Sequence, residues 1–206
     1  MRQQAIAGHR ALDVGDLPDQ GAFGPSGLIW WGTVGYMVIE GSMFVMVLAA
    51  YYFLRTRVTE WPPSAPLPDP TVATVGVVML FASLIPNQMV KSAAERLDLK
   101  RVRLLMPVLL MFELAVIVLR AFEFPAIGAP WDWNAYASIT WFILGLHTSH
   151  LVTDFSDSVV LTALVFTGHA EPKRMVDVSE NGLYWYFVVL SWIPVYLTIY
   201  FAPRWL

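Results

Sequence analysis

The chain has 206 residues, of which 57% are hydrophobic and only 14% are charged, and its mean hydropathy is +0.56. Soluble domains carry about 25% charged residues, so this composition excludes an ordinary soluble protein and indicates a membrane protein. Thirteen Lys and Arg against 16 Asp and Glu give a net charge of −3, and without a long basic run nucleic acid is excluded as a partner. Cysteine is absent, which excludes disulfides, thiolate metal sites and covalently attached haem in this chain.

Apolar runs of membrane-spanning length divide the chain. A spanning helix needs about 20 mainly apolar residues. Five segments meet this length: residues 28–54, 71–90, 102–122, 136–166 and 183–201. Proline and charged residues punctuate the linkers, and no segment has the alternation of period two that a membrane barrel requires. We therefore predict an all-α fold, a polytopic bundle of five transmembrane helices over residues 28–206, preceded by a flexible cytoplasmic tail over residues 1–27.

The distribution of Lys and Arg predicts how the bundle is oriented. The tail and the second and fourth linkers together carry 9 of these residues, whereas the first and third linkers and the C-terminal end carry 4. Because positively charged loops tend to remain in the cytoplasm, we expect the N-terminus inside and the C-terminus outside, on the periplasmic side.

Several acidic residues lie inside the predicted spans. Glu40 follows Trp30 by ten residues, which at ~1.5 Å per residue places it about 15 Å into a hydrocarbon core about 30 Å thick. Glu113 is similarly deep in the third span, and both are candidate functional groups because ionised carboxylates are costly at this depth. The alternative is a protonated carboxyl group that hydrogen-bonds a neighbouring helix. Arg120 and Glu123, three residues apart, are expected to form an ordinary ion pair at the membrane interface.

The fourth span carries four polar residues at spacings of three, four and three. They are His147, His150, Asp154 and Asp157. This spacing places them on one stripe of a helix, and we expect at least one of the histidines within hydrogen-bond reach of Glu40. Imidazole and carboxylate suit Fe, Zn or Mn, but the bundle-type di-iron motif needs Glu-x-x-His on two helices, which the chain lacks. We therefore predict that the stripe binds no metal and lines a hydrogen-bonded network or a subunit interface.

Four stretches carry motifs in a fixed order. The first span contains GYMVIEGSMFVMVLAAYYFLR, the third ends in LRAFEF, the fourth contains GLHTSHLV, and the C-terminal region reads ENGLYWYFVVLSWIPVYLTIYFAPRW. They resemble motifs of the cytochrome c oxidase subunit III family: its helix with a buried Glu, its Gln-x-x-Glu-aromatic ending, its Gly-aromatic-His-x-x-His-Val segment and its Glu-x-Gly-x-Tyr-Trp terminal motif. The resemblance covers residues 28–206 in collinear order. It maps the family positions onto Glu40, Glu123, His147, His150, Glu180, Gly182, Trp185, Phe187, Trp192 and Tyr196.

The chain also departs from the family pattern. Tyr186 stands where the family usually has His, Val189 where it usually has Asp, and Arg120 where it usually has Gln. The acids that fall where the pattern is small or apolar are Glu113, Asp154 and Asp157. The resemblance therefore implies a divergent member with five helices instead of seven, the two missing helices being those that would precede residue 28.

The resemblance implies a non-catalytic accessory subunit of a haem-copper cytochrome c oxidase in a bacterial plasma membrane. Such a subunit packs on catalytic subunit I and its neighbours, sometimes within a respiratory supercomplex, holds phospholipids, and supports turnover and proton uptake, while haem and copper stay in partner subunits. One alternative is the subunit-III-like protein associated with nitric oxide reductase. Another is an independent proton-coupled transporter or di-iron membrane protein that uses the fourth-span stripe, although the repeats and paired broken helices typical of transporters are not visible.

Overall fold

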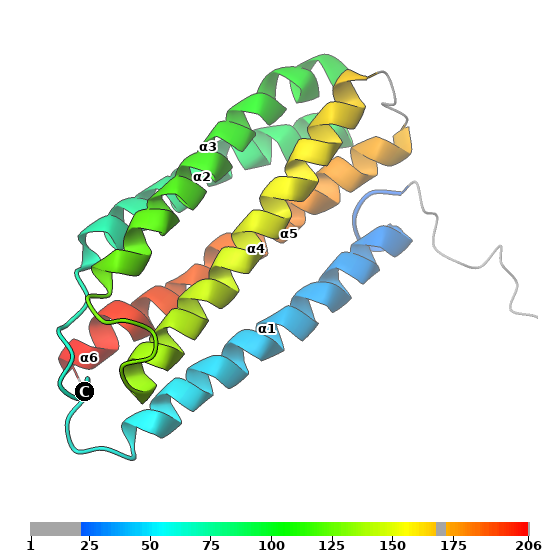
Figure 1. Cartoon of the computed structure of the whole chain (residues 1–206). Coiled ribbons are helices and arrows are strands. Elements are labelled where there is room, and N and C mark those ends of the chain that lie inside the picture. Colours follow the sequence, from blue (N-terminus) through cyan, green and yellow to red (C-terminus); the bar gives the residue numbers. More distant parts are fainter. Residues whose placement is uncertain (1–21, 168–171, 206) are drawn as a thin grey trace, which may run out of the picture.

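The computed structural model describes residues 22–167 and 172–205, and within these residues the chain is almost entirely helical. A short 3-10 turn, η2 (Gly24–Ser26), leads into the first long helix. The long helices are α1 (Leu28–Arg55), α2 (Pro70–Glu95), α3 (Leu99–Ala126), α4 (Ala135–Phe166) and α5 (Pro172–Tyr196). A π-helical turn, η3 (Leu197–Phe201), and a final turn, α6 (Ala202–Trp205), continue α5 (Figure 1). Residues 1–21, most of the predicted tail, lie outside the described residues.

The predicted all-α fold with five long apolar helices is confirmed in these residues. Each of the five long helical stretches is long and apolar enough to cross a membrane. The last one begins at Pro172, earlier than the start expected at residue 183. The intervening residues are too polar to be recognised as part of a span. Hydrogen bonds and ion pairs of their polar side chains stabilise the helix in this region. Ser179 Oγ accepts a hydrogen bond from Lys91 of α2 (2.7 Å), and Arg174 forms an ion pair with Asp177 (3.1 Å).

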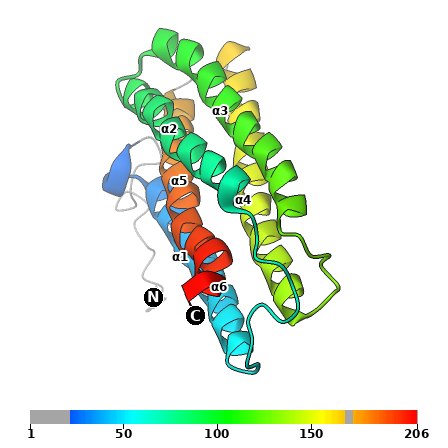
Figure 2. The same cartoon turned by 90° about the vertical axis from the view of Figure 1, so that its left-hand side faces the viewer.

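The helices run up and down in a bundle with α5 at its centre. α5 contacts α1, α2 and α4, whereas α2 and α3 form an antiparallel pair that packs on α5 and α4. α1 packs chiefly on α4 and α5 and lies apart from the α2–α3 pair, as Figures 1 and 2 show from two directions. The helix directions bring the starts of α1, α3 and α5 to one end of the bundle and the starts of α2 and α4 to the other (Figure 1).

Polar side chains define where three helices begin. Asp69 accepts a hydrogen bond from the Thr71 backbone N–H (2.9 Å) at the start of α2. Asp98 and Asn134 cap α3 and α4 in the same way, by accepting from backbone N–H groups of the first turn. Each cap satisfies an N–H group that has no partner inside its helix. The interhelical linkers therefore end where the sequence supplies a short polar side chain.

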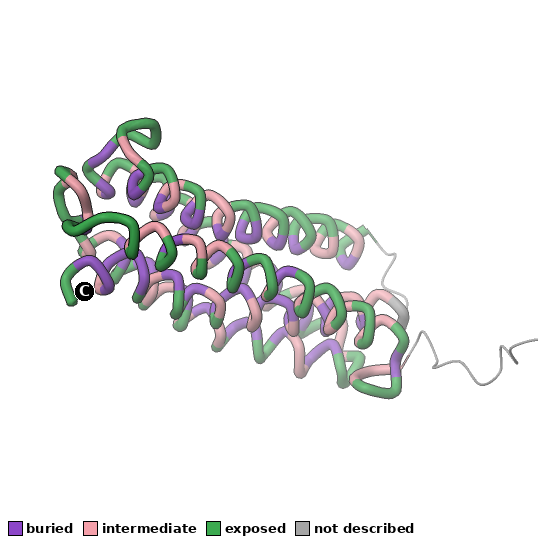
Figure 3. Tube along the Cα trace, turned by 90° about the horizontal axis from the view of Figure 1, so that it is seen from below, coloured by how far each residue is buried: buried purple, intermediate pink, exposed green. Residues whose placement is uncertain are grey.

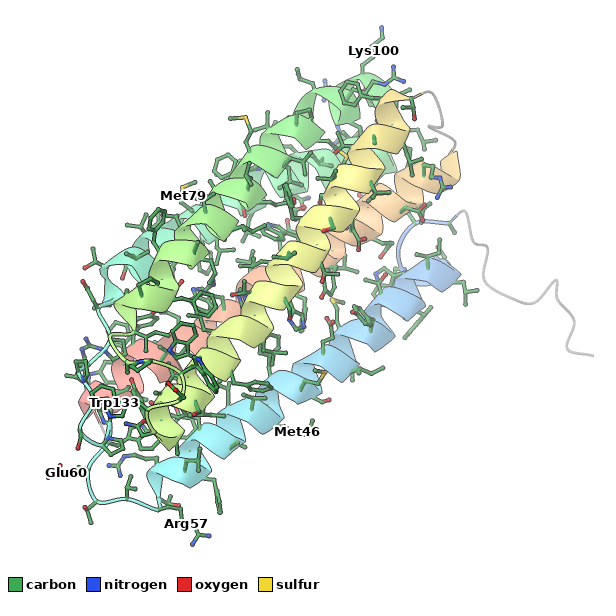
Figure 4. All side chains as sticks on the ribbon, in the orientation of Figure 1. Met46, Arg57, Glu60, Met79, Lys100 and Trp133 are labelled. Carbon is green, nitrogen blue, oxygen red and sulfur yellow. The ribbon has the colours of Figure 1, made fainter. Side chains whose placement is uncertain are left out.

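The outside of the bundle is apolar, whereas the outside of a soluble protein is mostly polar. Large apolar side chains cover its outside, including Met46, Ile85 and Leu104, which are all more than half exposed. The buried residues face the interior of the bundle along each helix (Figure 3). Figure 4 shows Met46 on the outer face of α1 and Lys100 and Arg57 at opposite ends of the bundle. This distribution suits a hydrocarbon surround with water at both ends.

Candidate functional site

Glu40 lies in the interior of the bundle, where α1 meets α4 and α5. Its side chain is buried, and Tyr184 on α5 donates a hydrogen bond to Glu40 Oε2 (2.5 Å). On the other side, His150 Nε2 of α4 lies 3.4 Å from Glu40 Oε1. The Phe44 ring covers His150 at a centroid distance of 4.9 Å. The histidine neighbour that the sequence predicts for Glu40 is therefore present.

Hydrogen-bond geometry restricts the tautomer of His150. Its Nδ1 donates to the Leu146 carbonyl at 2.6 Å, so in the neutral imidazole Nε2 carries the lone pair. Within the described residues Nε2 makes no hydrogen bond, and it faces Glu40 Oε1 inside the bundle.

A second buried cluster surrounds Arg120 on α3. The guanidinium forms an ion pair with Glu123 (Nη1 to Oε2, 2.7 Å) and is 3% exposed. It lies over the Trp192 ring at 3.7 Å from the centroid, a cation–π contact. Tyr200 donates a hydrogen bond to the other carboxylate oxygen, Glu123 Oε1 (2.6 Å). The expected ion pair is present, but it is buried, because His147 of α4, Trp192 of α5 and Tyr200 of η3 cover the two side chains.

His147 belongs to the Arg120 cluster and not to the Glu40 pair. Arg120 Nη2 donates to His147 Nδ1 (3.2 Å), so Nε2 carries the proton and donates to the Val188 carbonyl (3.0 Å). The ring also stacks on Trp192 at 4.7 Å between centroids. Both ring nitrogens are occupied by hydrogen bonds, which leaves no lone pair for a metal ion.

A third cluster joins the two remaining deep acids. Glu113 on α3 and Asp154 on α4 are completely buried. Ser158 donates to Glu113 Oε1 (3.1 Å), and Asn181 of α5 donates to Ser158 Oγ (2.9 Å). In the described part of the chain no hydrogen bond reaches Glu113 Oε2 or either Asp154 oxygen.

The fourth residue of the predicted stripe lies elsewhere. Asp157 is exposed, on the wall of a cavity of about 650 Å³ between α1, α4 and α5. Glu180 and Asn181 line the same cavity from α5, and Tyr184 connects it to Glu40. The four residues of the stripe thus lie in four different surroundings, and Ser158, one residue further along, is buried where Asp157 is exposed.

Two of the family-motif positions on α5, Gly182 and Trp185, face α2. Trp185 is fully buried and its indole N–H donates to Ser83 Oγ (2.8 Å). Gly182 lies against Asn87, whose amide donates to the Gly182 carbonyl (2.9 Å), and a Cβ at this position would meet Asn87 Oδ1 at 3.1 Å. These contacts explain a large aromatic residue and a glycine three positions apart on one helix face.

Two residues on α5 that differ from the family pattern, Tyr186 and Val189, both contact other residues of the bundle. Tyr186, in the position of the usual His, donates to Gln88 Oε1 on α2 (2.7 Å). Val189, in the position of the usual Asp, is fully buried in the apolar core. At the first position the chain therefore keeps a polar side chain that makes a hydrogen bond. At the second it has an apolar side chain that packs in the core.

Sequence reasoning missed the partners that complete the three clusters. They are Tyr184, Ser158, Asn181 and Tyr200. The signal for Ser158 is its spacing of four from Asp154, which continues the helical stripe. Tyr184 and Tyr200 carry no comparable signal, because tyrosines near membrane interfaces are common. Among the described residues no three His, Asp or Glu side chains gather closely enough to hold a metal ion.

Proteins named cytochrome c oxidase subunit 3 are similar to this chain over most of its length. The protein from Thermostichus vulcanus is 22% identical over 177 residues, covering 84% of this chain and 87% of the relative. A protein from Nocardia farcinica, named as a probable subunit 3, is 25% identical over 175 residues, with 83% and 86% covered. The Synechocystis protein is 23% identical over 185 residues, with 87% and 78% covered. No protein-family model matches the chain.

The apolar exterior and the buried polar clusters define the class of protein, an all-α bundle whose five long helices are each long and apolar enough to cross a membrane. The similarity to curated proteins runs along nearly the whole chain, as the ordered motifs do. The chain is a distant relative of cytochrome c oxidase subunit 3, as the motifs predict.

Proposed function

We propose that this chain is a non-catalytic accessory subunit of a haem-copper cytochrome c oxidase in a bacterial plasma membrane. The observation that carries the proposal is its similarity, along more than four fifths of its length, to proteins named cytochrome c oxidase subunit 3. In this role the chain packs on the catalytic subunit, holds phospholipids on its apolar faces, and supports turnover and proton uptake. Haem and copper belong to the partner subunits.

The occupancy of the histidines supports an accessory role. His147 uses both ring nitrogens in hydrogen bonds, and His150 uses Nδ1 on its own helix while Nε2 faces Glu40. A haem or copper site needs a histidine nitrogen with a free lone pair directed at the metal. His147 has no such nitrogen. His150 Nε2 carries a lone pair directed at Glu40, but among the described residues no third His, Asp or Glu side chain lies close enough to complete a metal site, which argues equally against a di-iron site on the fourth-helix stripe.

The proposal includes an orientation. The linkers richest in Lys and Arg lie at one end of the bundle, where α2 and α4 end and α3 and α5 begin. Lys100 marks this end of the bundle in Figure 4. By the positive-inside rule this end faces the cytoplasm and the C-terminus faces the periplasm. The cavity lined by Asp157 and Glu180 then opens toward the cytoplasm, the side from which a terminal oxidase takes up protons.

Copurification tests the assignment directly. We expect a tagged chain extracted in mild detergent to bring with it a multi-histidine subunit, haem absorbance and cytochrome c oxidase activity, while an untagged strain yields none of these. Recovery of haem with nitric oxide reduction but no oxygen reduction would assign the chain to a nitric oxide reductase instead. Recovery of the chain alone, folded and without haem, would refute both assignments and favour an independent transporter.

A second measurement tests the accessory role. We expect the complex isolated without this chain to retain haem and to begin oxygen reduction, but to lose activity during sustained turnover faster than the complete complex. Complete loss of initial activity with haem and partner subunits intact would contradict a non-catalytic role.

A further inference from the structure

Glu113 and Asp154 are buried acids that form no salt bridge in the described part of the bundle. Both are 0% exposed, and they interact electrostatically with one another across α3 and α4. Ser158 links them spatially, because it donates to Glu113 and lies one helical turn from Asp154. The other titratable groups that interact with Asp154 are Asp157 on α4 and Tyr184 on α5. No salt bridge reaches either acid in the described residues, so no cation compensates a negative charge there.

Burial without compensation favours the neutral form of a carboxyl group. An ionised carboxylate in a low-dielectric interior costs so much free energy that it takes up a proton unless it is paired or hydrogen-bonded. Two carboxylates close together add mutual repulsion to this cost. One hydrogen bond, from Ser158, serves a pair that has four oxygen atoms. The pair therefore retains at least one proton at neutral pH.

A chain of polar groups connects this pair to the cavity between α1, α4 and α5. Asn181 lines the cavity and donates to Ser158 Oγ, and Ser158 donates to Glu113. The cavity wall also carries Arg174, Asp177 and Glu180, whose charges suit a water-filled space. Ser158 is fully buried and Asn181 separates it from the cavity. Because a serine hydroxyl both donates and accepts hydrogen bonds, Ser158 is able to pass a proton to Glu113 from a water molecule that is admitted past the Asn181 amide.

We propose that Glu113 and Asp154 form a proton-binding site inside the membrane that exchanges its proton with water in this cavity through Ser158. The proton is taken from cavity water and returned to it, and no other bond changes. This site is separate from the Glu40–His150 pair, which meets the same cavity through Tyr184. The inference rests on the geometry of this chain and not on its assignment to an oxidase.

Infrared difference spectroscopy tests the site on the full chain, purified with whatever subunits accompany it. A protonated carboxyl group has a C=O stretching band that ionised carboxylates lack and that shifts in heavy water. We expect this band at neutral pH, its loss or reduction in Glu113→Gln and in Asp154→Asn, and a shifted band in Glu113→Asp. Glu95→Gln, at an exposed carboxylate paired with Lys91, serves as the control and leaves the band unchanged.

The exchange rate of the band tests the route. We expect Ser158→Ala to keep the band but to slow its shift in heavy water severalfold, whereas Ser156→Ala, on the exposed face of α4, leaves the rate unchanged. The proposal is overturned if folded Glu113→Gln and Asp154→Asn both retain the complete wild-type band. The role of Ser158 is overturned if Ser158→Ala exchanges as fast as the wild type. Neither outcome depends on whether the copurification experiment finds an oxidase.

Discussion

The buried Arg120–Glu123 pair offers the sharpest test of the packing. Substituting Arg120→Met removes the cation but leaves the Glu123 carboxylate buried, with Tyr200 as its remaining donor. The side chains of the pair are 3% and 4% exposed, so solvent cannot replace the lost charge. Removal of one partner from a buried pair costs about 3–5 kcal/mol. The loss of the contact with Trp192 adds to this cost, since a desolvated cation–π contact contributes up to about 2 kcal/mol.

The assay is the free energy of unfolding of the purified full-length chain, measured by titration with sodium dodecyl sulfate in mixed micelles. We expect the double variant Arg120→Met with Glu123→Gln to be less destabilised than Arg120→Met alone, because glutamine leaves no buried charge and still accepts from Tyr200. Arg101→Met is the control, because its pair with Asp98 is 68% exposed on the Arg101 side and contributes about 0–1 kcal/mol. Equal losses for Arg120→Met and Arg101→Met would refute the reasoning.

Two further substitutions test local contacts. Tyr184→Phe removes the donor to the buried Glu40 and should lower the free energy of unfolding by about 1–3 kcal/mol, whereas an unchanged value would show that water replaces the hydroxyl. Asp69→Ala removes the cap of α2, and the hydrogen bonds from Thr71 hold the pKa of Asp69 below its usual range. Ionised Asp69 therefore stabilises the fold above its unfolded-state pKa, and this contribution is lost as the pH falls through the folded-state pKa. The stability difference between wild type and Asp69→Ala should exist at neutral pH and vanish in acid, and a difference that persists in acid would contradict the cap.

Much of the architecture follows from the sequence because a membrane imposes one simple requirement. A backbone in hydrocarbon must satisfy its hydrogen bonds internally, so about 20 consecutive apolar residues specify a helix whatever their neighbours are. Residues 28–54 and 136–166 agree with α1 and α4 to within one residue at each end. The start of α5 was missed because its first turns are polar, and their helical state depends on partners supplied by α2 and α4.

The division of the polar residues among clusters depended on the tertiary structure. Helical periodicity places His147, His150 and Asp154 on one stripe, and all three are buried. The stripe nevertheless meets different neighbours along its length: Arg120 from α3 beside His147, Glu40 from α1 beside His150, and Glu113 from α3 near Asp154.

By itself, the sequence determined that this chain is a bundle of membrane helices with acids in its interior, because hydropathy and helical spacing are local properties. Only the tertiary structure decided which acid meets a histidine and which meets another acid, and that the Arg120–Glu123 pair, which the spacing within α3 predicts, is buried. Those pairings depend on the relative height and rotation of helices that are distant in sequence. The uncompensated pair of Glu113 and Asp154 arises in this way, since the two acids come from α3 and α4.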